Sequence, residues 1–284
     1  MVGATEPVGC CSWTEQRRSD GAPRFADKAS SRSNSGRASQ KPGIVIPLCS
    51  AWSKAKRHQF NPLTVAEMDE LVGAGRAAEV FRHGPDRVLR RYRDGRDCTD
   101  EVTAMDWLRR QGLPVPLVEL ASDTGSMVME FVSGQSMFEQ LSAAPQGFVR
   151  HARTLAKLQR QINSIVAPLW FPERGVGAVV VHTDLHPMNV IYGPSGPVVI
   201  DWTNFGRGPA SLDGAMTAVL VESFEVKQFH ERAGRQLFLS AFSLFRGRSI
   251  VLAGMAEAAA RRLKDPNITV GEQVVVAEMV HKHH

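Results

Sequence analysis

The sequence lacks an apolar run of the roughly 18 residues that a membrane-spanning helix needs. Its N-terminus, MVGATEPVGCCSWTEQRRSD, has no charged start followed by an apolar core, so it does not resemble a signal peptide. These two absences favour a cytoplasmic protein without a membrane partner.

The sequence also lacks a zinc-binding cluster and a basic folded body. The four cysteines, which we expect to be free thiols, match no zinc spacing: Cys10, Cys11, Cys49 and Cys98. The net charge of +5 comes from residues 1–60, which hold ten Lys and Arg against four Asp and Glu, whereas residues 61–284 hold 24 against 25. The body therefore has no charge excess that would attract a nucleic acid.

Residues 1–60 also lack hydrophobic periodicity. They are rich in Ser, Arg, Gly and Ala, as in DKASSRSNSGRASQKPG, and this composition buries too little apolar surface to fold. We predict a disordered basic leader here. A basic docking tail for a nucleic acid or a membrane is the functional alternative.

Regular patterning begins after the leader. The stretch ELVGAGRAAEVFRHGPDRVLRRYRD predicts three short strands, and VPLVELASDTGSMVMEFVSG predicts two more. Between them, Val102, Met105 and Leu108 follow helical spacing, and Gly112 is a plausible stop. Residues 61–132 are thus expected to form a five-stranded antiparallel sheet with one helix.

Residues 133–284 are expected to be mainly helical. Helices are predicted over 148–165, 211–223, 227–242 and 250–263, with short strands on either side of a polar loop near residue 185. A strand-rich part followed by a helix-rich part predicts an α+β fold of two lobes with a cleft between them.

The polar loop lies in VVVHTDLHPMNVIYGPSGPVVIDW. His182, Asp184 and Asn189 follow one apolar run, and Asp201 ends the next one, after a hairpin. Asp and Asn often serve only to close turns. The alternative is that these residues bind a metal ion and accept a proton.

The spacing H-x-D-x-x-x-x-N, followed by Ile-Asp-Trp, resembles the catalytic loop and metal-binding Asp of the protein-kinase-like fold. His186 and the Trp after Asp201 make the chain similar to the aminoglycoside phosphotransferase and choline-kinase-like small-molecule kinases. The resemblance covers about residues 63–284. It implies ATP and Mg²⁺ as cofactors and a small-molecule hydroxyl as the phosphate acceptor.

The resemblance also assigns roles. Asp184 would accept the hydroxyl proton, and His182 would brace this catalytic loop. Asn189 and Asp201 would supply the hard oxygen ligands that suit Mg²⁺. Asp213 resembles a family Asp, for which a structural role as a cap or loop brace is expected.

Nucleotide-binding residues are expected in the first lobe. Gly73 and Gly75 could cover the phosphates with backbone N–H groups, although a hairpin turn also favours glycine. Ala78 stands where protein kinases usually have a third glycine, and Val80 would lie over the adenine by resemblance.

A cation is expected on the third strand, where Arg90 replaces the usual Lys. Strand alternation places Arg90 and Arg91 on opposite faces of the sheet. By resemblance, the Val-Leu-x pattern of this strand places Arg90 in the cleft. Glu101 is its expected ion-pair partner, and a solvated strand arginine is the alternative. The segment from Glu130 to Val132 would form the hinge that contacts adenine.

The sequence therefore predicts an ATP-dependent phosphotransferase that moves the γ-phosphate to a small-molecule alcohol. A nucleotide-binding pseudokinase or scaffold is the alternative, because Arg90 and Ala78 depart from the usual pattern. Neither the acceptor nor the oligomeric state follows from the sequence.

Overall fold

The computed structural model describes residues 70–75, 77–226 and 229–282. The predicted leader and Cys10, Cys11 and Cys49 lie outside these residues. Within the described part, no helix combines the length and the apolar character that a bilayer crossing requires.

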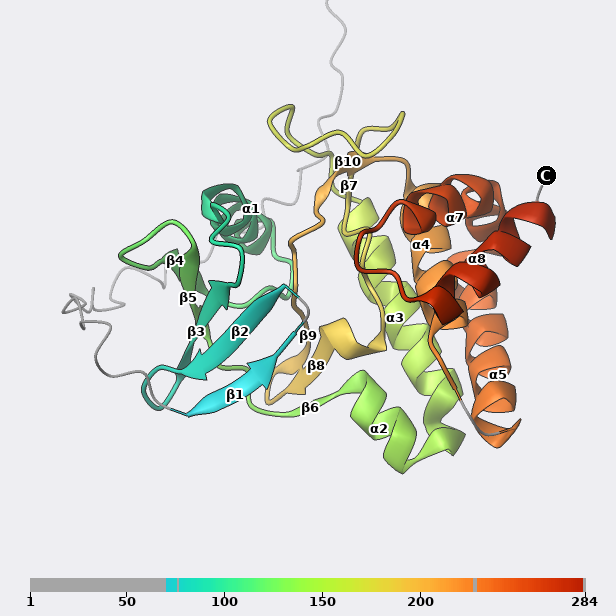
Figure 1. Ribbon diagram of the computed structural model, residues 1–284, viewed down its shortest axis with the longest axis horizontal. Coiled ribbons are helices and arrows are strands. Elements are labelled where there is room, and N and C mark those ends of the chain that lie inside the picture. Colours follow the sequence, from blue (N-terminus) through green and yellow to red (C-terminus); the bar gives the residue numbers. More distant parts are fainter. Residues whose placement is uncertain (1–69, 76, 227–228, 283–284) are drawn as a thin grey trace, which may run out of the picture. The chain divides into compact units, whose positions relative to one another are not determined.

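The N-terminal lobe is a five-stranded antiparallel sheet with one helix, as predicted (Figure 1). The strands have the order β1-β2-β3-β5-β4. They are β1 (Leu71–Ala74), β2 (Ala78–Arg82), β3 (Arg87–Tyr92), β4 (Val118–Leu120) and β5 (Ser126–Glu130). Helix α1 (Thr99–Arg110) joins β3 to β4 and buries Val102, Met105 and Leu108, the three residues at helical spacing.

A short connection after β5 leads into the second lobe. There β6 (Gln135–Ser136) pairs with β8 (Val190–Gly193), and β8 pairs with β9 (Gly196–Val199). Gly134, in this connection, has a φ of 153°, and a Cβ there would lie 2.1 Å from the carbonyl oxygen of Tyr192. Only glycine allows this close approach of the connection to β8.

The C-terminal lobe is mainly helical, and β7 (Val179–Val181) pairs with β10 (Gly206–Gly208) inside it. Its helices are α2 (Met137–Ala143), α3 (Phe148–Asn163), α4 (Ala210–Ser223), α5 (Phe229–Arg246), α6 (Arg248–Ala253), α7 (Met255–Leu263) and α8 (Val270–Lys282). The fold is therefore the α+β, two-lobed, protein-kinase-like architecture that the resemblance implied.

One helix prediction was wrong in detail, and two helices were not predicted. The single helix expected over 250–263 is divided between α6 and α7 at Gly254, where a Cβ would lie 2.2 Å from the carbonyl oxygen of Ser211. This close contact with the start of α4 fixes the break. Helices α2 and α8 were not predicted; the run of valines at 274–276 in α8 favours a strand when the sequence is considered alone.

Trp202 belongs to the hydrophobic core and directly follows Asp201 in the chain. This side chain is fully buried, and its Nε1 donates to the carbonyl oxygen of Val199 at 3.1 Å. Trp202 thereby anchors the chain immediately after Asp201.

Candidate active site

The catalytic loop between β7 and β8 is held by Asp213 of α4. The carboxylate is fully buried, and its Oδ1 accepts from the backbone N–H groups of His182 at 3.0 Å and Thr183 at 2.8 Å. Thr217, one helical turn further on, donates to the carbonyl oxygen of Leu185 at 2.7 Å. The prediction that Asp213 is a loop brace is confirmed.

Thr183 lies in the left-handed backbone region, with a φ of 57°. A β-branched residue is strained there, by about 1–3 kcal/mol. The bond from its N–H to Asp213 and the bond from its Oγ1 to the carbonyl oxygen of Asn204, at 2.7 Å, hold it in place. The strain lies one residue before Asp184 and fixes the direction in which the chain presents that carboxylate.

His182 contacts the backbone on both sides of its ring. Its Nδ1 accepts from the N–H of Asp184 at 3.3 Å, so its Nε2 carries the hydrogen and donates to the carbonyl oxygen of Ile200 at 3.2 Å. The ring is fully buried against Trp202, and burial lowers the pKa of His182. His182 is thus placed to position the loop, while its ring is not exposed to a substrate.

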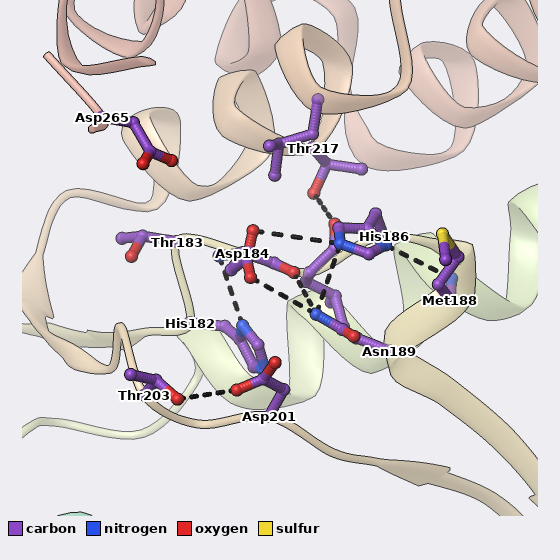
Figure 2. A network of polar contacts seen from close by, with 12 residues as sticks. His182, Thr183, Asp184, His186, Met188, Asn189, Asp201, Thr203, Thr217 and Asp265 are labelled. Carbon is purple, nitrogen blue, oxygen red and sulfur yellow. Dashed lines mark hydrogen bonds and ion pairs between the residues drawn. The ribbon is translucent and has the colours of Figure 1, made fainter. Parts of the chain in front are cut away.

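Asp184 projects from the loop toward the side chains of Asn189 and His186 (Figure 2). Asn189 Nδ2 donates to the Asp184 carbonyl oxygen at 2.9 Å and approaches its Oδ2 at 3.5 Å. Burial and the negative charge of Asp201 raise the pKa of Asp184 to about 7, with Arg262 opposing. A carboxylate with a pKa near neutrality suits proton acceptance at physiological pH.

Two side-chain oxygens remain for a cation. Asn189 uses its Nδ2 within the loop, and Asp201 uses its Oδ1 for Arg90 and Thr203. Among the described residues, neither Asn189 Oδ1 nor Asp201 Oδ2 makes a hydrogen bond. Asp201 also has a left-handed φ of 60°, a conformation that Asp tolerates better than most residues.

Arg90 is a buried cleft residue and not a solvated strand residue, since it is only 8% exposed. The expected ion pair is present, with Arg90 Nη1 3.1 Å from Glu101 Oε1. Arg90 Nη2 also contacts Asp201 Oδ1 at 2.7 Å, which the sequence did not predict. Burial would lower the pKa of Arg90, but the charges of Asp201 and Glu101 raise it above its ordinary value.

Two hydroxyl groups complete this cluster, and the sequence analysis missed both. Thr203 donates to Asp201 Oδ1 at 2.7 Å and lies 3.0 Å from the hydroxyl of Tyr92. Tyr92 also donates to Glu101 Oε2. A signal was present in the spacing, because Tyr92 is two residues after Arg90 on one strand and therefore shares its face.

The glycine hairpin between β1 and β2 lies at the edge of the cleft, which both Gly73 and Gly75 line. Neither belongs to the described glycines with a positive φ, and a Cβ at either would make only ordinary contacts, at 3.9 and 3.6 Å. The turn itself therefore does not require glycine at these positions. Ala78 is buried on β2, where it pairs with Tyr92, so it belongs to the core and not to the turn.

Of the residues expected to form the hinge, Glu130 ends β5 and Val132 lies between β5 and β6; their contact with adenine stays a prediction. The N–H of Glu130 donates to the carbonyl oxygen of Leu117, and the N–H of Phe131 donates to that of Asp86, both at 2.8 Å. In the described chain, the N–H of Val132 makes no such bond. Val132 and Val80 both line the cleft, so the faces of a nucleobase could pack on aliphatic side chains while its polar edge accepts from the Val132 N–H.

The cleft has a volume of about 1740 Å³ and continues past Asp184 to the segment that joins α7 and α8. Asp265 of this segment lies above Asp184 in Figure 2. Arg262 is nearly buried and pairs with Asp265 at 2.5 Å and with Glu272 at 2.9 Å. The sequence analysis did not single out these residues, which lie 60 or more positions after the loop and carry no motif.

The sequence matches a known protein family. The model of the family described as "Phosphotransferase enzyme family" matches residues 70–178 and 151–247. No curated protein matches the sequence.

Solved structures with a similar fold include a gentamicin complex of the aminoglycoside phosphotransferase APH(2'')-IIa, at 12% identity and a TM-score of 0.49, covering 76% of this chain and 90% of that one. Choline kinase from Cryptosporidium parvum Iowa II matches at 11% identity and a TM-score of 0.49, covering 78% and 90%. A choline/ethanolamine kinase family protein from Mesorhizobium loti matches at 16% identity and a TM-score of 0.46, covering 75% and 86%.

The family model spans most of the described chain, and its match includes Asp184, Asn189 and the Arg90 cluster. The chain belongs to the phosphotransferase enzyme family.

Proposed function

We propose that the protein is a small-molecule kinase that transfers the γ-phosphate of ATP to a hydroxyl group. The observation that carries this proposal is the convergence of Asp184, Asn189, Asp201 and Arg90 on one cleft, together with the family match. The cytoplasmic location expected from the sequence stays a prediction.

In this proposal the nucleotide base lies between Val80 and the hinge, and the N–H of Val132 donates to its edge. The Gly73–Gly75 hairpin covers the phosphates with its backbone, although the N–H of Gly75 already donates to the carbonyl oxygen of Ala78 at 2.8 Å, and Arg90 neutralises part of their charge. Asp184 orients the acceptor hydroxyl and takes its proton at a carboxylate oxygen.

The donor set fits Mg²⁺. No cluster of three or more His, Cys, Asp or Glu that could hold a metal exists among the described residues. Mg²⁺ needs no such cluster, because it is commonly bound through one or two protein oxygens with phosphates and water completing its shell. Asp201 and Asn189 would hold it, and the bound ion would neutralise phosphate charge.

The alternative is a pseudokinase that binds nucleotide without turnover. The contact between Arg90 and Asp201 favours it, because an ion pair at 2.7 Å engages a residue that should bind the metal. Asp201 Oδ2, which has no partner among the described residues, and the geometry of the Asp184 loop favour the enzyme. Turnover decides between the two.

The test is a screen for ATP and GTP consumption by the purified protein with a panel of hydroxylated metabolites and aminoglycosides. We expect turnover with at least one acceptor. Asp184→Asn should lower it by about 10²–10⁴-fold, the usual contribution of a positioned base, while binding of the ATP analogue AMP-PNP survives. Asp123→Asn, in an exposed turn, is the matched control.

Three outcomes are informative. Wild-type turnover in Asp184→Asn would show that another group accepts the proton. Binding of AMP-PNP without turnover on any acceptor would favour the pseudokinase. Absence of nucleotide binding would overturn both functions.

A further inference from the structure

The cluster around Arg90 contains two hydroxyl groups to which the proposed reaction assigns no role. We propose that Thr203, supported by Tyr92, is a positioning residue that keeps Asp201 oriented for the metal–nucleotide complex. This inference rests on the proposed function, and its test separates the two.

The two carboxylate oxygens of Asp201 differ in their hydrogen bonds. Thr203 Oγ1 and Arg90 Nη2 both donate to Oδ1, each at 2.7 Å. Within the described chain, Oδ2 accepts no hydrogen bond. The protein thus holds the carboxylate by one oxygen and presents the other to the cleft.

The Thr203 hydroxyl contacts three groups through one hydrogen and its lone pairs. A threonine hydroxyl carries one hydrogen, and the Thr203 hydrogen goes to Asp201. Its lone pairs then accept from Arg90 Nη2 at 3.1 Å and can accept from the Tyr92 hydroxyl at 3.0 Å. Thr203 is therefore a junction between Asp201 and the N-terminal lobe, and a valine of the same shape could not replace it.

Tyr92 is 3% exposed, and its hydroxyl contacts both Glu101 and Thr203. Its single hydrogen goes to one of the two at a time. When that hydrogen goes to Thr203, Tyr92 links the Asp201 segment to the first lobe by a hydrogen bond; when it goes to Glu101, Tyr92 supports Thr203 by packing alone. Tyr92 supports Thr203, so its loss should matter less.

Arg90 alone does not keep the Asp201 carboxylate oriented when a nucleotide binds. If Arg90 turns to a nucleotide phosphate, its bond to Asp201 weakens at the moment when Asp201 must bind the metal. The Thr203 hydroxyl donates its hydrogen directly to Oδ1, so this bond does not depend on the position of Arg90. The bond from Thr203, two residues away on the same segment, therefore holds the carboxylate when Arg90 moves.

This role predicts a loss confined to metal-dependent binding. Calorimetric titration with AMP-PNP, in Mg²⁺ and separately in EDTA, measures the two affinities. Thr203→Val should weaken binding in Mg²⁺ about tenfold, the factor that ~1.4 kcal/mol represents, and leave binding in EDTA unchanged. Thr203→Ser keeps the hydroxyl and should bind like the wild type.

Two further variants complete the design. Tyr92→Phe should weaken Mg²⁺-dependent binding by about threefold, as expected for one neutral hydrogen bond. Thr103→Val, on the exposed face of α1, removes a hydroxyl that bonds only the carbonyl oxygen of Thr99 and is the matched control. If Thr203→Val does not fold, Thr203→Ser and Tyr92→Phe still test the proposal.

Equal losses in Mg²⁺ and in EDTA would show that Thr203 merely supports the fold, and this would overturn the proposal. So would wild-type binding by Thr203→Val, or loss of Mg²⁺-dependent binding in Thr203→Ser. Failure of the wild type to bind AMP-PNP under either condition would instead overturn the proposed function.

Discussion

The brace at Asp213 permits a quantitative prediction, because each of its hydrogen bonds is defined. Oδ1 accepts from the N–H groups of His182 and Thr183, and Oδ2 accepts from Asn163 Nδ2 at 2.8 Å. The orientation of Asn163 is fixed independently, since its Oδ1 accepts from Arg246 Nη2 at 2.5 Å. A donor group therefore faces Oδ2.

Asp213→Asn should keep the two bonds to the loop and lose the third. Its amide NH₂ would face the NH₂ of Asn163, and this unsatisfied contact between buried donors should cost about 1–3 kcal/mol. Asp213→Ala would remove all three acceptor contacts at about 3–9 kcal/mol, which overlaps the whole stability of a domain, roughly 5–15 kcal/mol. The amide variant is therefore the informative one.

The assay is thermal unfolding followed by circular dichroism, with urea denaturation to obtain the free energy of unfolding. A loss of about 2 kcal/mol corresponds to a Tm lowered by roughly 4–8 °C for a chain of this size. The control is Asp123→Asn, which makes the same chemical change in an exposed turn and should leave Tm unchanged. A Tm for Asp213→Asn within about 1 °C of this control would refute the brace as described.

Three other outcomes are expected. Arg90→Met leaves the buried carboxylate of Glu101 without its cation and should cost about 3–5 kcal/mol; adding Glu101→Gln should recover part of this in urea denaturation, and no recovery would argue against the ion pair. Gly134→Ala forces a side chain into backbone and should lower Tm, whereas Gly234→Ala, in open space on α5, should stabilise by about 0.5–1 kcal/mol; similar Tm changes would contradict the close contact. Burial raises the pKa of Cys98 to about 11, so peptide mapping should show this thiol unlabelled by iodoacetamide at pH 8 until the protein unfolds, and rapid native labelling would contradict its burial.

The sequence predicted the sheet and the polar loop because both depend on short-range patterns. Strand alternation and turn residues specify β1, β2 and β3, and the spacing of His182, Asp184 and Asn189 lies within one loop. Helix boundaries were less predictable where a distant contact decides them. The break at Gly254 exists because the start of α4 lies against its backbone. The local sequence around position 254 does not indicate this long-range contact.

The polar contacts between distant segments were beyond a sequence argument for the same reason. Arg90 and Asp201 are 111 positions apart, and so are Tyr92 and Thr203. A tyrosine on a strand and a threonine in a loop are common, and only the fold brings their hydroxyl groups to 3.0 Å. The sequence could identify which residues carry charge, but not which hydrogen bonds fix them.

The cluster also changes how Arg90 should be interpreted. A lysine would bind from a single nitrogen, whereas Arg90 contacts Glu101 through Nη1 and both Asp201 and Thr203 through Nη2. A planar guanidinium with several donors fits two carboxylates and a hydroxyl on two different segments, which a compact ammonium fits less well. Arg90, which stands in place of lysine, therefore has partners that suit a guanidinium. The larger size of arginine alone is a weak reason to expect an inactive protein. The stronger argument for a pseudokinase is the bond between Arg90 and Asp201, and the Mg²⁺-dependent affinity of the Thr203 variants measures whether Asp201 still binds a metal.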